Sequence, residues 1–203
     1  MSDRIEDIAV AMVQPGQGIL AADESTGTIK KRLESIHVPS TELNRRDYRE
    51  MLFRTTNAMK DNISGVILFE ETLYQKAADG TPLVDIIRAA GAIPGIKVDK
   101  GAKPLPMHEG EKITEGLDSL AERLSDYHEA GARFAKWRGV ISISRDLPTP
   151  SAVRANATAL ARYAALCQQA GIVPIVEPEV LMDGAPGDHS IDRCAEVTEF
   201  VLN

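Results

Sequence analysis

Charged side chains stand at the carboxyl-terminal ends of several apolar runs that otherwise look like buried strands. A strand that is buried on both faces of a parallel sheet is normally an unbroken apolar run. Here the runs end in ionisable residues, namely Asp23, Glu70, Glu71, Lys97, Asp99, Lys136, Arg138, Glu177 and Glu179. Such groups are costly to bury unless they meet one another or a charged ligand. The pattern therefore predicts either structural ion pairs at the edge of a sheet or a site for a charged ligand.

The spacing of these groups favours the site. Three pairs lie two residues apart: Lys97 with Asp99, Lys136 with Arg138, and Glu177 with Glu179. Residues i and i+2 lie on one face of a strand, so both members of each pair point the same way. Lysines and an arginine beside carboxylates suit an anionic, phosphorylated substrate. Crowded lysines also suit carbonyl chemistry, because crowding makes the neutral, nucleophilic amine more accessible.

The elements that must position these groups alternate in type. Short apolar runs predict five strands, at 18–23, 63–69, 93–100, 132–143 and 172–176. Helical periodicity predicts helices at 4–13, 28–36, 42–58, 83–90, 114–130 and 191–202, and a long alanine-rich helix with Ser151 as its N-cap. The apolar residues of these helices include Val13, Ile36, Leu43 and Met51. Residues 183–190 are expected to form a loop. This alternation predicts an α/β fold in one domain, with a parallel sheet wrapped by helices.

Composition excludes several classes of protein. The 203 residues carry a formal net charge of -7, which does not favour nucleic-acid binding. Only Cys167 and Cys194 are present, so there is no disulfide framework, and a cytoplasmic setting is the simplest interpretation. The first residues are acidic and do not resemble a signal peptide. No apolar run approaches the roughly 20 residues that a membrane helix needs.

Three weaker motifs were considered and set aside. The glycines of Gly16-Gln-Gly18 precede a strand, whereas the dinucleotide-binding fingerprint follows one. The four histidines, His37, His108, His128 and His189, lack metal-ligand spacing, so we expect no bound metal. The glycosylation patterns at Asn62 and Asn156 fall in predicted regular structure.

Seven segments together resemble the class I fructose-bisphosphate aldolases. They are Gly18-Ile-Leu-Ala-Ala-Asp-Glu-Ser-Thr-Gly27, Asn44-Arg-Arg46, Gly65-Val-Ile-Leu-Phe69, Glu71-Thr-Leu-Tyr-Gln-Lys76, Gly95-Ile-Lys-Val-Asp-Lys-Gly101, Phe134-Ala-Lys-Trp-Arg138 and Ile172-Val-Pro-Ile-Val-Glu-Pro-Glu179. The similarity extends from about residue 4 to the end of the chain. It implies a TIM (β/α)8 barrel, of which this chain holds the first five βα units.

The resemblance also implies roles for individual residues. The implied catalytic residues are Asp23 for proton transfer, Lys136 as a cation beside the Schiff-base lysine, Glu177 as general acid/base, and Glu179 to orient the lysines. The implied substrate contacts are Ser25, Thr28, Arg32, Arg45, Lys97 and Arg138. Thr28 stands where many relatives have serine, and it keeps the hydroxyl. The implied activity is reversible cleavage of fructose 1,6-bisphosphate without a cofactor, in a homotetramer.

One feature of the family's pattern is not found in these 203 residues. The family's Schiff-base lysine lies on the sixth strand, and this chain reaches Asn203 before such a segment. We therefore expect the chain alone to be inactive and prone to associate. Two alternatives remain open from the sequence. The chain could be a non-catalytic product that acts only by association, or it could belong to another phosphosugar barrel enzyme, such as an isomerase, although the Lys136/Arg138 and Glu177/Glu179 pairs argue against that.

Overall fold

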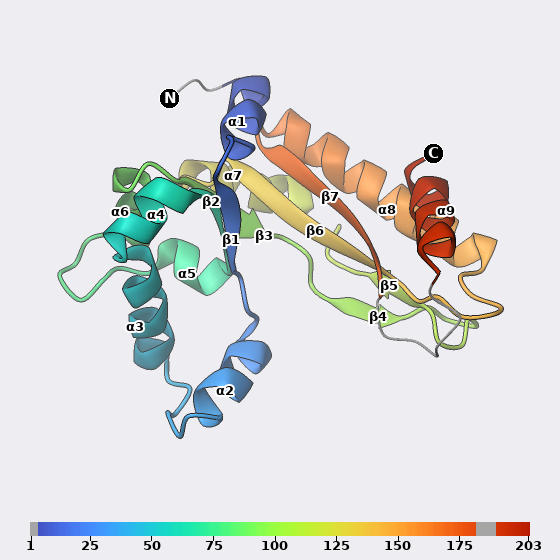
Figure 1. Ribbon diagram of the computed structural model, residues 1–203, viewed down its shortest axis with the longest axis horizontal. Coiled ribbons are helices and arrows are strands. Elements are labelled where there is room, and N and C mark those ends of the chain that lie inside the picture. Colours follow the sequence, from blue (N-terminus) through green and yellow to red (C-terminus); the bar gives the residue numbers. More distant parts are fainter. Residues whose placement is uncertain (1–3, 182–189) are drawn as a thin grey trace.

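The sheet is a parallel half-barrel. The computed structural model describes residues 4–181 and 190–203. Its central strands are β1 (Gly18–Ala22), β2 (Ile63–Leu68), β3 (Ile93–Lys97), β6 (Phe134–Ile141) and β7 (Val173–Val180), paired in that order and all parallel. The curved sheet crosses the centre of Figure 1, and it confirms the five predicted strands. Most of the predicted loop, 183–189, lies outside the described residues.

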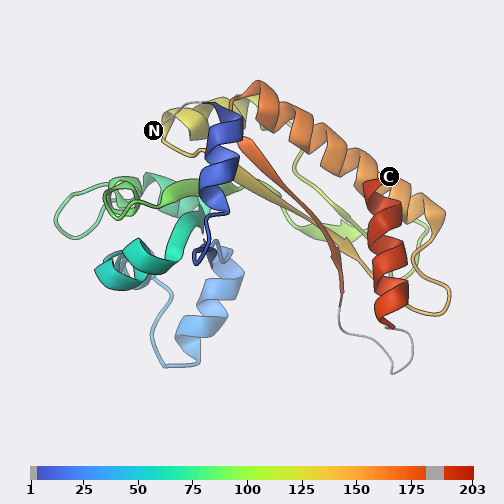
Figure 2. The same cartoon turned by 45° about the horizontal axis from the view of Figure 1, so that its top comes forward.

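Helices follow the strands along the chain. In order they are α1 (Ile5–Met12), α2 (Thr26–Glu34), α3 (Glu42–Phe53), α4 (Thr56–Asn62), α5 (Glu70–Tyr74), α6 (Leu83–Ala89), α7 (Leu120–Glu129), α8 (Pro150–Gln169) and α9 (Ile191–Leu202). Figure 2 shows α8 and α9 side by side at one end of the molecule. Within the described residues, no helix combines the length and the apolar character that crossing a membrane would require.

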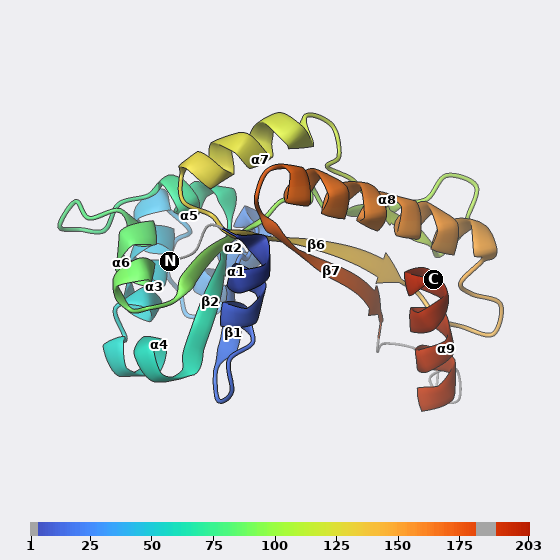
Figure 3. The same ribbon diagram turned by 90° about the horizontal axis from the view of Figure 1, so that it is seen from above.

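The two faces of the sheet bury different sets of residues. On the outer face, Trp137 stacks on Tyr163 of α8 with ring centroids 5.5 Å apart, and the Tyr163 hydroxyl donates to the Ala135 carbonyl at 2.6 Å. Figure 3 shows α7 and α8 along this side and α1 on the other. On the inner face, Ile8 and Met12 of α1 pack against a separate apolar cluster of Ile67, Ile93 and Phe134. This cluster forms a floor beneath the carboxyl-terminal ends of the strands.

The floor depends on two glycines. A Cβ atom at Gly95 would lie 2.3 Å from the Phe134 ring, and one at Gly65 would lie 3.0 Å from it. Real Cβ atoms do not approach as closely as the position at Gly95 would, so the ring requires glycine there, and a side chain at Gly65 would push the ring by a few tenths of an ångström. The buried Phe134 ring therefore occupies the space that side chains at Gly65 and Gly95 would fill on the inner face.

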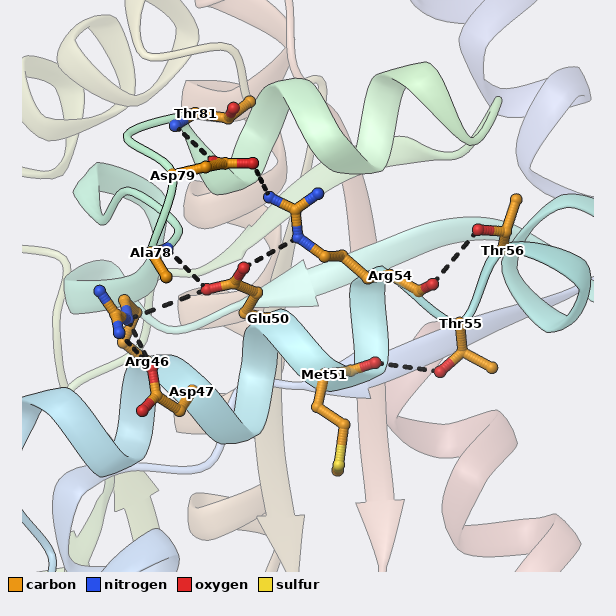
Figure 4. Close-up of polar contacts among 10 residues, drawn as sticks. All are labelled: Arg46, Asp47, Glu50, Met51, Arg54, Thr55, Thr56, Ala78, Asp79 and Thr81. Carbon is orange, nitrogen blue, oxygen red and sulfur yellow. Dashed lines mark hydrogen bonds and ion pairs between the residues drawn. The ribbon is translucent and has the colours of Figure 1, made fainter.

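The predicted helix over 42–58 is wrong, because the segment is two helices. α3 ends at Phe53 and α4 begins at Thr56. Figure 4 shows the Thr55 hydroxyl donating to the Met51 carbonyl, at 3.0 Å. Threonine side chains that bond to nearby backbone compete with helix continuation. Four of the apolar residues of the predicted helices, Val13, Ile36, Leu43 and Met51, are exposed.

The predicted helix over 114–130 begins too early. Residues Lys112–Thr114 form β5, which pairs antiparallel with β4 (Ala102–Pro104) in a hairpin after β3, and the helix starts only at Leu120. Gly116 has φ +125, and a Cβ there would lie 2.9 Å from the Lys100 nitrogen, so this turn requires glycine. The Thr114 hydroxyl donates to the Arg138 carbonyl at 2.7 Å, which holds the hairpin against β6.

Two further boundaries differ from expectation. The N-cap of α8 is Thr149, not Ser151, because Pro150 takes the first helical position and the Thr149 hydroxyl accepts from the Ala152 N–H at 3.2 Å. β7 continues to Val180, so the Glu177-Pro178-Glu179 segment lies inside the strand instead of following it. β7 is one of the two edge strands of the described sheet, and edge strands tolerate proline.

The Phe134 floor can be tested with Gly95→Ala. The added methyl group must displace a buried ring, so we expect the free energy of unfolding to fall by about 1–3 kcal/mol in urea denaturation. Gly27→Ala is the matched control, because nothing lies within 4 Å of its Cβ position in α2. The control should be neutral or slightly stabilising. Equal stability of Gly95→Ala and the parent protein would contradict the packing.

Candidate active site

Two lysines lie side by side on adjacent strands. Lys97 of β3 pairs in register with Lys136 of β6, so both side chains leave the same face of the sheet. Each lysine has its own carboxylate: the Lys97 Nζ is 3.5 Å from Asp99, and the Lys136 Nζ is 3.3 Å from Glu177. Both lysines are half-buried, where such partners offset the cost of desolvation.

The next pair along the same face is Arg138 with Glu179. The Arg138 guanidinium binds both oxygens of the Glu179 carboxylate, one contact being 3.0 Å long. These hydrogen bonds raise the pKa of Arg138, although partial burial acts to lower it. Glu179 was expected to orient lysines, whereas its carboxylate here holds an arginine. Five of the charged residues singled out in the sequence therefore share one face of the sheet: Lys97, Lys136, Arg138, Glu177 and Glu179.

The remaining predicted residues lie around the end of β1. Asp23 directly follows β1, two strands away from Lys97 in the sheet order, and is half-buried. Ser25 is the N-cap of α2, and its hydroxyl lies 3.1 Å from that of Thr28. Arg32, on the next turn of α2, is ion-paired with Glu24. No described contact joins these side chains to the lysine pair.

Arg45 is held by its own protein partners. Its guanidinium binds both oxygens of Glu71, at 2.9 and 2.5 Å, and the Ser40 carbonyl at 2.8 Å. The hydrogen bonds from Arg45 lower the pKa of the Glu71 carboxyl, although burial acts in the opposite direction. Arg45 therefore stands beside the end of β2 as part of an ion pair.

Two of the charged residues singled out in the sequence leave this face. Glu70 and Glu71 are the first residues of α5 and do not extend β2. Glu70 accepts from the Tyr127 hydroxyl at 2.8 Å and from Lys100 at 3.3 Å. Its contacts are with α7 and the loop after β3, so Glu70 supports the outer layer and not the lysine pair.

Sequence reasoning missed Arg49. Its side chain is 0% exposed, between the carboxylates of Glu24 at 3.9 Å and Glu71 at 3.6 Å. The signal was present in the sequence, because Arg45, Arg49 and Phe53 follow one another at intervals of four, the spacing of one helix face. The more numerous apolar residues of α3 obscured it.

The geometry is suited to an anionic carbonyl substrate. Lys97, Lys136 and Arg138 present positive charge on one face at the carboxyl ends of their strands, where barrel enzymes place their active sites. Glu177, within contact of a lysine, can exchange protons with a reacting group beside it. Within the described ranges, no group of three or more histidine, cysteine or acidic residues could hold a metal ion.

The Arg45–Glu71 pair predicts an acid-dependent loss of stability. Because the pKa of Glu71 is lowered on folding, its contribution is present above its unfolded pKa of about 4.3 and is lost as pH falls through the folded value. Arg45→Met should cost about 1–3 kcal/mol at pH 7 and progressively less below pH ~4, in urea denaturation across this range. On a Glu71→Gln background the pH-dependent part should vanish. A difference that is independent of pH in both backgrounds would contradict the pairing.

Comparison with known proteins gives close relatives. Residues 4–203 match the family model described as "Glycolytic: Fructose-bisphosphate aldolase class-I". The chain is 56% identical over 200 residues to a probable fructose-bisphosphate aldolase class 1 of Xanthomonas campestris, covering 98% of this chain and 59% of the relative. It is 60% identical over 188 residues to the cytosolic fructose-bisphosphate aldolase 6 of Arabidopsis thaliana, covering 93% of this chain and 51% of the relative.

The fold agrees with a solved structure as well. Fructose-bisphosphate aldolase from Plasmodium falciparum, in a ternary complex with TRAP and a small-molecule inhibitor, superposes with a TM-score of 0.89 at 50% identity, covering 100% of this chain and 58% of that one. The chain thus spans little more than half the length of the proteins it matches. On the sequence match, the half-barrel and the shared fold, this chain belongs to the class I fructose-bisphosphate aldolase family.

Proposed function

We propose that this chain supplies part of the active site of a Schiff-base fructose-bisphosphate aldolase. The reaction is the reversible cleavage of fructose 1,6-bisphosphate into dihydroxyacetone phosphate and glyceraldehyde 3-phosphate. The observation that carries the proposal is the Lys136–Glu177 pair, at 3.3 Å, beside a second lysine in register. Membership of the family supports the choice of substrate. An isomerase on the same fold is disfavoured by the paired lysine, arginine and glutamates.

Glu177 is the general acid/base that removes water from the carbinolamine. This step needs a proton delivered to a departing hydroxyl, and a carboxyl group beside a lysine can deliver it. Lys136 supplies positive charge next to the Schiff-base nitrogen, and Asp23 assists proton transfer from the end of β1. Glu179 lies two residues after Glu177 on β7 and fixes the Arg138 guanidinium. The two glutamates of β7 thus hold the two cations of β6.

The cations bind the substrate's phosphate and hydroxyl groups. Lys97 and Arg138 flank Lys136 on the same face, so they contact the hydroxyls and one phosphate. Ser25, Thr28, Arg32 and Arg45 contribute from the ends of β1 and β2, where Arg45 and Arg32 are already ion-paired with Glu71 and Glu24. Their donors turn to the substrate by exchanging a carboxylate partner for a phosphate, which arginine also binds through two parallel hydrogen bonds.

The Schiff-base lysine lies outside residues 1–203, and the chain acts with a sixth strand that carries it. Alone, these residues would be inactive and prone to association. The chain works in the cytoplasm on a small sugar phosphate, within a homotetramer, without a metal or other cofactor and without nucleic-acid or membrane partners. The alternative is a non-catalytic product that acts only by association. It predicts no turnover of fructose 1,6-bisphosphate even in the protein expressed from its whole gene.

Glu177→Gln tests the assignment of the acid/base. In the protein expressed from its whole gene, kcat for fructose 1,6-bisphosphate cleavage should fall ~100-fold or more while KM changes little, because the amide cannot donate the proton. Glu70→Gln is the matched control, since Glu70 contacts Tyr127 and Lys100 instead of the lysine pair. Unchanged turnover in Glu177→Gln, or equal losses in both variants, would contradict the role.

Borohydride trapping tests where the nucleophile lies. Reduction in the presence of dihydroxyacetone phosphate should leave a stable adduct on one lysine, and peptide mapping should place it on no peptide from residues 1–203. Residues 1–203 expressed alone should show neither adduct nor cleavage. An adduct on Lys97 or Lys136, together with measurable cleavage, would refute the proposal.

A further inference from the structure

Arg49 is a buried cation at the centre of a network that joins three elements. It projects from α3 and lies between Glu24, which follows β1, and Glu71, in the first turn of α5 after β2. Its Nη2 donates to the Glu24 backbone carbonyl at 2.8 Å, and its guanidinium carbon lies 5.9 Å from the Phe69 ring centroid. Arg49 therefore contacts the chain just beyond both of the first two strands.

The two carboxylates of this network each have a second arginine. Arg32 binds Glu24 from α2, and Arg45 binds Glu71 from α3, one turn before Arg49. Both outer arginines reach solvent, at least in part, whereas Arg49 does not. Of the three arginines, Arg49 is the one that bridges both carboxylates. It thereby couples the position of the β1–α2 junction to that of the β2–α5 junction.

Stability does not explain a cation at this position. The Nε and Nη1 atoms of Arg49 and the Oε2 atom of Glu24 are buried without a hydrogen-bond partner. An incompletely bonded buried charge carries a desolvation cost, and well-packed apolar residues often replace buried ion networks without loss of stability. What an apolar side chain could not supply is the directional bond to the Glu24 carbonyl, which fixes the backbone next to Asp23.

We propose that Arg49 is a positioning residue, which holds Asp23 and the start of α2 in place for the aldolase reaction. The inference rests on the proposed function, in which Asp23 assists proton transfer. Glu24 is the residue after Asp23 and the residue before Ser25, the N-cap of α2. Holding its carbonyl fixes the peptide that joins the proposed acid/base residue to the proposed phosphate-contacting helix. Lysine at position 49 would keep the charge but lose the planar fork that reaches the Glu24 carbonyl and both carboxylates together.

The matched control is Arg54 at the end of the same helix. Arg54 also binds two carboxylates, Glu50 at 2.8 Å and Asp79 at 2.5 Å, as Figure 4 shows. Its side chain is 42% exposed, however, and its partners lie on α3 itself and on the loop before α6. Arg54→Lys therefore makes the same chemical change in a similar ion network, whose described contacts do not include Asp23 or Glu24.

The experiment compares Arg49→Lys and Arg54→Lys in the protein expressed from its whole gene, each with and without Asp23→Asn. We expect Arg49→Lys to lower kcat about 10- to 100-fold, because small misplacements of reacting groups have effects of this size. On the Asp23→Asn background the same change should have little further effect, since the group that it positions is already gone. Arg54→Lys should leave kcat unchanged in both backgrounds.

A second measurement does not depend on turnover. The N–H of Thr28 bonds to the Ser25 hydroxyl and that of Ile29 to the Ser25 carbonyl, so these amides report on the start of α2. Hydrogen exchange at both should be faster in Arg49→Lys than in Arg54→Lys. Equal exchange, or losses of kcat that are multiplicative with Asp23→Asn, would overturn the inference. If the parent protein did not cleave fructose 1,6-bisphosphate, the proposed function would fail, while the exchange comparison would still decide whether Arg49 positions this segment.

Discussion

Two lysines in register on adjacent parallel strands are the constraint on which the rest of the site depends. Lys97 and Lys136 leave the same face of the sheet, so their like charges repel unless negative groups stand nearby. The carboxylates come from two places: Asp99, two residues further along the chain, and Glu177 on the next strand. Arg138 and Glu179 repeat the arrangement one step further. Positive and negative side chains therefore alternate in this cluster, and the register of the strands sets their positions.

Opposite charges also meet at the carboxyl-terminal ends of β1 and β2, but there they come from different elements. There the acids follow the strands, at Glu24 and Glu71, and the cations come from helices α2 and α3. These pairs include one fully buried arginine, Arg49, whereas Arg32 stays exposed. Both halves of the sheet therefore place charged groups at the same edge. Strands carry the cations in one half, and helices carry them in the other. The strand-borne half is suited to contact a substrate directly, and the helix-borne half is suited to hold the backbone.

The apolar floor explains how so many charges can face the inside of a barrel. Phe134 lies two residues before Lys136 on the same face, above Gly95 and beside Ile67 and Ile93. With α1 packed against it, this layer is buried, whereas the charged layer above it is half-buried. One strand therefore carries a core residue and two site residues in succession. The boundary between the apolar layer and the charged layer lies where the sheet passes from the packed interior to the carboxyl ends of its strands.

The sequence by itself determined the five parallel strands and the common face shared by Lys136 with Arg138 and by Glu177 with Glu179, since alternation along a strand is a local property. Only the tertiary structure decided which acid meets which cation, because pairing depends on register between strands that are far apart in sequence. Contacts between distant segments also explain why the segment at Gly116 is a turn packed against Lys100 and not the start of the predicted helix. The four-residue spacing of Arg45, Arg49 and Phe53 could place Arg49 on the buried face of its helix, but no local pattern records that the carboxylates of Glu24 and Glu71 converge on it.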